Sequence, residues 1–449
     1  MCDRPFRSRR ASYQGLIRLT HLVSSARLGI GLSCLFLLWG CRLPGSVVER
    51  PTPTPSPSPS PVAPSPTPPA ASPELPQEAS AELLRESWEA YRQRFIQVDG
   101  RVIDWEAEAR STSESQAYAM LRAVLIDDPE TFARTLQWGE DNLRRKQDEQ
   151  PTDNLWAWRW GQANDEDESE WGILDQNFAI DADIDAATAL ILAARRWNRP
   201  DYLPLAQAKL ADIWNLSTVE VEGRRYLLPG PIAAFQKGDR LILNPSYYAP
   251  YAFRLFAQID PERNWQALVE GSYDFLNRVA ADSPVSLPSD WVAYEPKTQT
   301  LSPLTEADAV VNNTSSNLIT QYAFDAYRVW WRVALDEVWF GAPEASAFLD
   351  QHLNYMQQLW QDQGAIPAQM NLAGEAIVNY EATSQYGMLY AALRERSPLI
   401  AREMFQQKLF PRYQEGLWDD ESAYYSQNLA WLGLFPPAGL PPRLLSPAP

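Results

Sequence analysis

The spacing of apolar residues constrains the fold of this chain more than any other feature. From about residue 80, apolar side chains recur at three- and four-residue steps, as at Leu84, Trp88, Tyr91 and Phe95, which is the spacing of one helix face. Alternating strand patterns are sparse, and Pro, Gly and Asp/Asn turns separate the helical stretches up to residue 433. About a dozen helices fit this length, and a ring of paired helices is one way to give them a common core. Periodicity alone does not select that ring.

The N-terminal residues predict export and tethering. Residues 1–40 contain six Arg and an apolar run at 28–39, and this order is the layout of a signal peptide. The run is too short for a membrane span, which needs about 20 residues. The run ends in Leu38-Trp39-Gly40-Cys41, which resembles a bacterial lipobox. Lipidation of Cys41 is therefore expected, which would make the protein a lipoprotein of the periplasm or outer membrane. Ordinary signal cleavage, giving an extracellular protein, is the alternative.

Composition divides the rest of the chain into three parts. Residues 41–79 are rich in Pro, Ser, Thr and Ala, which predicts a semi-rigid linker that favours polyproline II structure. Residues 80–436 form the predicted folded domain, and 437–449 a Pro-rich tail.

Charge, cysteine and histidine exclude several classes of function. Asp and Glu outnumber Lys and Arg by 57 to 39, and no basic segment follows residue 40, so a nucleic-acid partner is not expected. All three Cys lie within the first 41 residues, which excludes disulfides and thiolate metal sites from the folded domain. The two His are His21, in the leader, and His352, in a polar stretch that predicts a surface position. Carboxylates remain for acid-base chemistry.

A first candidate carboxylate is Glu114. Ser113 and Gln116 fit a capping box before an apolar helix, so Glu114 could simply complement the helix dipole. As a general acid it would need a raised pKa, which requires burial and a like-charged neighbour to outweigh that dipole.

A second acidic motif, Asp181-Ala182-Asp183-Ile184-Asp185, opens the next apolar helix. A calcium loop is excluded, because its sixth position is Ala186 rather than Gly and its twelfth is Leu192 rather than Glu. Asp181 is either the N-cap or a carboxylate that stands beside Glu114.

A third candidate, Asp325, lies between aromatic residues. It could pair with Arg328 one turn on, in an ion pair worth about 0.3–0.5 kcal/mol if exposed, although its aromatic neighbours do not look like a solvated face.

Together these segments resemble glycoside hydrolase family 8, from Trp88 to Gly433. SESQAYAMLRAVLIDDPETF resembles the general-acid motif, AIDADIDAATALILAARRW the signature helix, and FDAYRVWWR the Asp-Ala-x-Arg motif of the general base. AWRW resembles the family's sugar-stacking segment, and NPSYYAPYAFRLFA and SDWVAY are similar to two further characteristic segments of the family. The chain departs from the family pattern at Ser115, Ile180, Ala186 and Trp330.

The resemblance implies an all-α (α/α)6 barrel with an open cleft at one end. It also implies inverting, endo-acting hydrolysis of a β-1,4-glucan by a cellulase-like enzyme, with the two carboxyl groups about 6.5–9.5 Å apart. Glu114 would be the general acid, Asp325 the general base, and Asp181 the residue that binds the distorted sugar. The resemblance implies that neither a metal nor a cofactor is required. The implied substrate contacts are Trp158, Arg159, Tyr247, Trp291 and Arg328.

Other readings stay open at this level. A chitosanase or xylanase of the same family is one, and a catalytically silent glycan-binding lipoprotein, motivated by Ser115, Ile180 and Trp330, is another. The resemblance further suggests the cellulose synthase machinery as a partner, and a monomer is expected.

Overall fold

The computed structural model describes residue 76 and residues 78–446, except 149, 163–169, 306–307, 309, 312–313 and 316–317. The chain divides into units 1–70 and 71–449, and the described residues all belong to the second. The predicted signal peptide, Cys41 and nearly all of the predicted linker lie outside them. Within the described part, no helix is long and apolar enough to cross a membrane.

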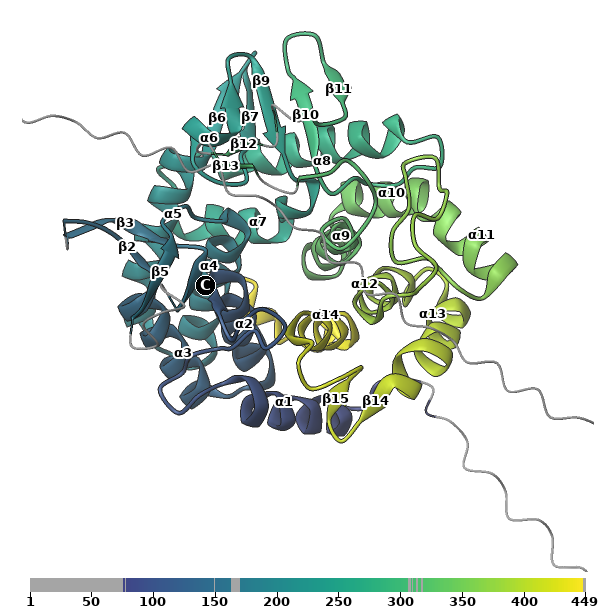
Figure 1. Cartoon of the computed structure of the whole chain (residues 1–449), viewed down its shortest axis with the longest axis horizontal. Helices are drawn as coiled ribbons and strands as arrows, with labels where there is room; N and C mark the ends of the chain where they lie inside the picture. Colours follow the sequence, from purple (N-terminus) through teal and green to yellow (C-terminus); the bar gives the residue numbers. More distant parts are fainter. Residues whose placement is uncertain are drawn as a thin grey trace, which may run out of the picture. The chain divides into compact units, whose positions relative to one another are not determined.

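An inner ring of helices forms the centre of the second unit (Figure 1). Each inner helix contacts the next one in the chain, and the last contacts the first, which closes the ring. In chain order these helices are α2 (Ser113–Ile126), α4 (Ile180–Arg196), α7 (Pro250–Ile259), α9 (Tyr327–Phe340), α12 (Thr383–Leu393) and α14 (Tyr424–Leu434).

Each inner helix packs against one outer helix, which confirms the predicted (α/α)6 barrel. The outer helices, in the order of their partners α2, α4, α7, α9, α12 and α14, are α3 (Pro129–Asn142), α5 (Leu203–Ser217), α8 (Trp265–Asp282), α10 (Pro343–His352), α13 (Pro398–Met404) and α1 (Ala81–Phe95). Two further helices, α6 (Ile232–Phe235) and α11 (Asn354–Gln363), lie in the connections.

Side-chain polarity decides which helices lie inside. α12 is buried at every position from Thr383 to Leu393, because small and apolar residues surround its axis. On α1, by contrast, the four residues with helical spacing, Leu84, Trp88, Tyr91 and Phe95, are buried, while charged residues occupy much of the opposite face. The predicted periodicity therefore identifies the core face of this outer helix.

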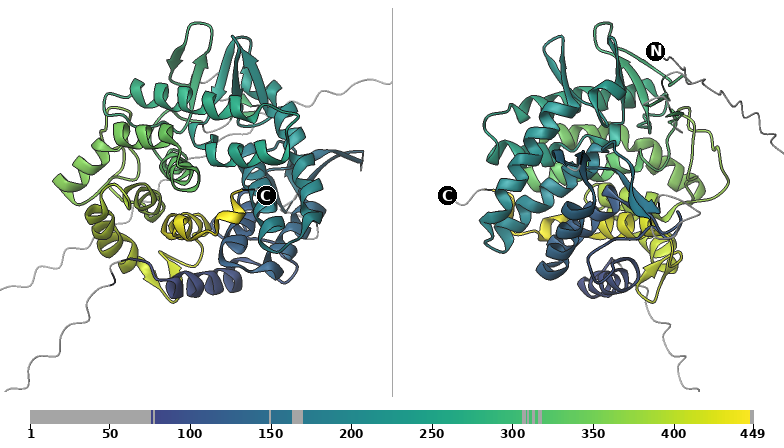
Figure 2. Two further views of the ribbon diagram at one scale, coloured as in Figure 1. Left: turned by 180° about the vertical axis from the view of Figure 1, so that it is seen from behind. Right: turned by 60° about the vertical axis from the view of Figure 1, so that its left-hand side comes forward.

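Short antiparallel sheets occupy the connections, and one of them projects beyond the helical ring (Figure 2). That sheet has the order β11-β10-β9-β8, and a second sheet has the order β1-β4-β5. The strands are β1 (Ser111–Thr112), β2 (Arg144–Gln147), β3 (Gln150–Trp156), β4 (Arg159–Gln162), β5 (Trp171–Asp175), β6 (Thr218–Val221), β7 (Arg224–Leu227), β8 (Gln236–Lys237), β9 (Arg240–Leu243), β10 (Val292–Glu295), β11 (Thr300–Ser302), β12 (Val310–Val311), β13 (Thr314–Ser315), β14 (Tyr413–Gln414) and β15 (Leu417–Trp418).

Two regions differ from simple sequence expectations. The Pro-rich segment after residue 436 packs against the barrel up to residue 446: Trp339 Nε1 donates to the carbonyl of Pro437 at 3.2 Å, and Leu444 is fully buried. The predicted surface position of His352 is wrong, because this residue lies on the inner face of α10 with 1% exposure and its ring contacts Phe348. Burial lowers the pKa of His352.

Candidate active site

The starts of the inner helices bring the acidic segments together. An outer helix lies between each inner helix and the next, so the inner helices run in the same direction and begin at the same end of the barrel. The first turns of α2 and α4, the turn before α9 and the start of α14 therefore meet, although up to 310 residues separate the side chains that touch.

Arg328, in the first turn of α9, is the centre of this cluster. One guanidinium nitrogen, Nη1, donates to Glu114 Oε2 at 2.6 Å and to Asp181 Oδ2 at 2.8 Å, and the other, Nη2, donates to Asp325. Its side chain is only 1% exposed. The alternative of an exposed Asp325–Arg328 pair is therefore wrong, since one buried cation binds all three candidate carboxylates.

Glu114 lies at the mouth of the barrel. Its second oxygen accepts a hydrogen bond from the Tyr424 hydroxyl at 2.9 Å, and its side chain is 20% exposed. Burial raises the pKa of Glu114 to about 7; Arg328 opposes this rise and Asp181 adds to it. Burial and the neighbouring Asp181 thus give Glu114 the raised pKa that a general acid needs.

The capping box of α2 is shifted by one residue from the predicted one. Thr112 is the N-cap, and its hydroxyl accepts from the Ser115 amide at 3.0 Å, while Ser115 Oγ accepts from the Thr112 amide at 3.2 Å. Thr112 has extended backbone because it pairs with Arg159 between β1 and β4, so the helix starts at Ser113.

The three acidic residues at the start of α4 make three separate ion pairs. Asp181 binds Arg328, Asp183 binds the buried Lys209 at 3.1 Å, and Asp185 binds Arg332 through both carboxylate oxygens at 2.8 and 2.9 Å. Asp181 is not the N-cap, which is Ala179. Its side chain is 3% exposed, and burial raises its pKa, while Arg328 opposes that rise.

Asp325 faces a hollow of about 520 Å³. The indole nitrogen of Trp291 donates to its Oδ2 at 3.0 Å, which fixes the side chain. The neighbouring Asp290 fixes the backbone, because its Oδ1 accepts from the amides of Ala323 and Ala326 at 3.1 and 2.8 Å. Burial, and then the charge of Asp325, raise the pKa of Asp290 to about 8.

The aromatic candidates differ in their positions. Tyr247 is half-buried, and the guanidinium carbon of Arg328 lies 5.3 Å from the centre of the Tyr247 ring. The Tyr247 ring also contacts Trp291 edge-on. Trp158 and Arg159 lie beside the first turn of α2, where the Trp158 carbonyl accepts from the Ser113 amide at 3.1 Å. The Arg159 guanidinium stacks on the Trp158 ring at 5.0 Å, and neither residue lines the hollow that contains Asp325.

Among the site residues that were missed from sequence are Asp290, Tyr424 and Tyr425. All three line the hollow. The tyrosine pair directly precedes a helical apolar run, as a tyrosine pair does at 247–248, and this shared pattern could have marked it. Asp290 belongs to the SDWVAY segment, but it was not singled out there, because its role depends on contacts with residues more than 30 positions away.

The negative charge of the site exceeds its positive charge. Glu114, Asp181 and Asp325 bind Arg328, and Asp290 lines the same hollow as Asp325. Repulsion among these carboxylates favours protonation of some of them. Among the described residues, no group of three or more His, Cys, Asp or Glu is arranged to hold a metal ion. The arrangement can donate a proton from one carboxyl group and accept one at another.

Comparison with known proteins identifies the family of this barrel. The model of glycosyl hydrolases family 8 matches residues 76–436, so the chain belongs to that family. An endoglucanase from Pseudomonas fluorescens (strain SBW25) is 35% identical over 209 residues, which are 46% of this chain and 51% of that protein. The chain thus spans about half the length of the curated relatives it matches.

Solved structures agree with the fold. An endoglucanase from Klebsiella pneumoniae has 28% identity and a TM-score of 0.60 over 77% of this chain and 97% of that one. An endo-1,4-D-glucanase from Vibrio fischeri ES114 has a TM-score of 0.64 over 78% of this chain and 93% of that one, and at 23% identity it supports the fold alone.

Proposed function

We propose that this protein is an inverting endo-β-1,4-glucanase. The observation that carries the proposal is the cluster in which Arg328 binds Glu114, Asp181 and Asp325 at the edge of the hollow. Inverting hydrolysis requires one protonated carboxyl group and one carboxylate on opposite sides of the scissile bond. The raised pKa of Glu114 suits the acid, and the open position of Asp325 suits the base.

In this mechanism Glu114 protonates the glycosidic oxygen, while Asp325 removes a proton from the attacking water. The bond between the anomeric carbon and that oxygen breaks as the water oxygen bonds to the carbon from the opposite face, so the anomeric configuration inverts. Asp181 binds the distorted sugar and favours protonation of Glu114. We expect the carboxyl groups of Glu114 and Asp325 to lie about 6.5–9.5 Å apart around the sugar.

The remaining predicted contacts surround this centre. Tyr247 and Trp291 offer apolar ring surfaces beside Arg328 and Asp325, and Trp158 and Arg159 stand beside the turn that carries Glu114. A hollow of about 520 Å³ is in the range of small-ligand sites. The proposal includes a lipid anchor at Cys41 that holds the enzyme at the cell envelope, with the cellulose synthase machinery as a partner.

Variants of the two carboxylates test the mechanism. Glu114→Gln and Asp325→Asn keep the size of the side chain but remove proton transfer. Each should lower the rate of carboxymethyl cellulose hydrolysis by about 10²–10⁴-fold. The wild type should release the α-anomer first, as seen by NMR. A β-anomeric first product, or wild-type rates in both variants, would contradict the assignment. Faster hydrolysis of xylan or chitosan than of cellulose would favour the other substrates, and binding without any hydrolysis the silent binder.

Stability separates catalysis from a structural role. Because the folded-state pKa of Glu114 is raised, ionisation of Glu114 opposes folding by an amount that grows from about pH 4.5 and is complete above about pH 7, up to about 3 kcal/mol. Glu114→Gln removes this cost, so its melting temperature at pH 8 should equal or exceed that of the wild type. A lower melting temperature would mean that Glu114 mainly stabilises the fold.

A further inference from the structure

Exposed apolar side chains gather on one side of the candidate site. In the described part of the chain, seven large apolar side chains are exposed, and four of these border two neighbouring hollows. Ile319 and Phe324 line the hollow of Asp325, while Ile377 and Tyr380 line the second. Single exposed apolar residues are ordinary, but a cluster beside a candidate site marks a binding surface.

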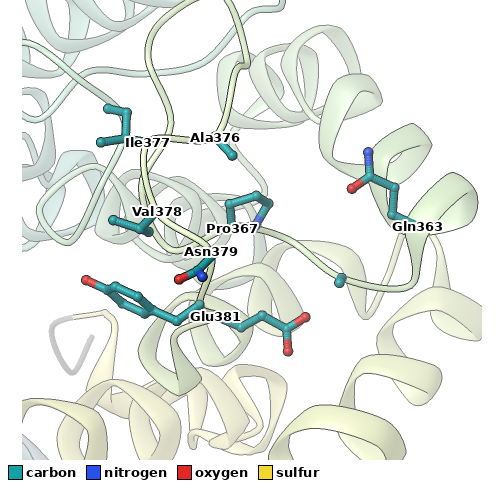
Figure 3. A pocket seen from close by; sticks show the side chains of 9 residues that line it. Gln363, Pro367, Ala376, Ile377, Val378, Asn379 and Glu381 are labelled. Atoms are coloured by element: carbon teal, nitrogen blue, oxygen red, sulfur yellow. The ribbon is translucent and has the colours of Figure 1, made fainter. Parts of the chain in front are cut away.

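The second hollow, of about 700 Å³, lies in the connection between α11 and α12 (Figure 3). Pro367, Ile377 and Val378 give it an apolar lining, and the amide side chains of Gln363 and Asn379 add hydrogen-bonding groups. Apolar surface with a few polar groups suits a sugar ring, which has both apolar faces and hydroxyl edges.

Backbone hydrogen bonds join this hollow to the segment that carries Asp325. The Ala368 amide donates to the Tyr380 carbonyl at 2.8 Å, so residues 368–380 fold back on themselves as a hairpin. Met370 in turn exchanges two hydrogen bonds, of 2.9 and 3.0 Å, with Tyr322, three residues before Asp325. Since paired strands lie about 4.7–4.9 Å apart, the outer strand of the hairpin lies roughly 10 Å from that segment.

Gln369 connects the two hollows through its side chain. It lines the hollow of Asp325, and its amide nitrogen donates to the Tyr380 hydroxyl at 3.3 Å. Tyr380 is 49% exposed, so this hydrogen bond helps to fix an aromatic side chain that stays open to solvent.

We propose that the hollow beside Tyr380 and Ile377 is a distal subsite that binds further sugar units of the same β-glucan chain. The inference rests on the proposed function and extends it from the reacting bond to chain length. A chain that reaches the second hollow gains contact with the Tyr380 ring and the neighbouring amides, whereas a short chain occupies the first hollow alone. Longer chains should therefore bind more tightly.

Binding to cello-oligosaccharides of increasing length tests the subsite. In the Glu114→Gln background, calorimetry on the whole protein should show that Tyr380→Ala weakens binding of long oligosaccharides by about three- to tenfold and leaves short ones unchanged. Tyr380→Phe keeps the ring and should retain most of the long-chain affinity. Leu399→Ala, at a position 69% exposed on α13, is the matched surface control and should change neither.

The outcomes separate this proposal from the catalytic one. An equal loss for all lengths, or no loss for any, overturns the distal subsite, as does an affinity of the Glu114→Gln parent protein that does not rise with length. These readings require binding only. If the length-dependent loss is seen but the wild-type enzyme hydrolyses no β-glucan, the subsite stands and the proposed reaction fails.

Discussion

At the residue scale, the site depends on pairs of neighbouring residues with different tasks. Asp290 holds the backbone on both sides of Asp325, and Trp291 holds its side chain. Two residues just before β10 therefore hold the turn that contains the proposed base, and Arg328 in α9 holds it as well. An error of about 1 Å in such a position can cost about 10²-fold in rate, so these contacts are expected to matter for turnover.

Substitutions of Asp290 test this role. With a pKa of about 8, Asp290 is protonated at pH 6, and asparagine copies that neutral form with its acceptor oxygen. Asp290→Asn should keep kcat at pH 6 within about twofold of wild type, whereas Asp290→Ala should lower kcat by about 10- to 100-fold with little change in KM.

The pH dependence of stability gives a second measurement on the same variants. Because the folded-state pKa of Asp290 is raised, its ionisation opposes folding progressively from about pH 4 to pH 8. Asp290→Asn should therefore lose less stability than wild type over that interval. Equal kcat values for the Asn and Ala variants would contradict a positioning role.

At the element scale, the sequence predicted the types of the site's helix starts better than their exact residues. A capping box before α2 was expected and is present, but both Thr112 and Ser113 can cap, and only the pairing of Thr112 with Arg159 decides between them. Likewise, the Asp-rich motif predicted a carboxylate at the start of α4, yet its three partners come from α5 and α9. Local sequence patterns predict that a helix forms, whereas contacts with residues distant in the sequence determine the residue at which it begins.

A matched pair of variants checks the α2 start. Thr112→Ala removes the oxygen that accepts from the Ser115 amide and should cost about 0.5–2 kcal/mol in unfolding free energy. Ser113→Ala should be neutral or slightly stabilising, because the buried Ser113 hydroxyl has no hydrogen-bond partner among the described residues. Urea denaturation measures both, and a larger loss in Ser113→Ala would restore the predicted box.

At the scale of the whole molecule, helix periodicity could predict how many helices the chain holds but not how they close. The ring closes where the final inner helix meets the first, and Arg328 binds Glu114 and Asp181 across 214 and 147 residues. No local pattern encodes such contacts, so the ring and the shared site came from the resemblance to family 8. One such long-range contact links the proposed general acid to the last inner helix, because Tyr424, in the first turn of α14, donates a hydrogen bond to Glu114.

The contact between α12 and α14 tests how the last inner helix packs into the ring. Gly433 lies against Gly387, and a Cβ added at Gly433 would stand 2.0 Å from the Gly387 carbonyl oxygen, a backbone atom that cannot turn aside. Alanine favours a helix by about 1 kcal/mol over glycine, but overpacking costs typically 1–3 kcal/mol and more against rigid backbone. Gly433→Ala should therefore lower the unfolding free energy, measured by urea denaturation, by about 1–3 kcal/mol.

Gly172→Ala is the control, because a Cβ at Gly172 meets nothing within 4 Å. Hydrolysis should fall with stability in Gly433→Ala, because the displaced α14 carries Tyr424, whereas equal stability of the two variants would mean that the helices do not approach this closely.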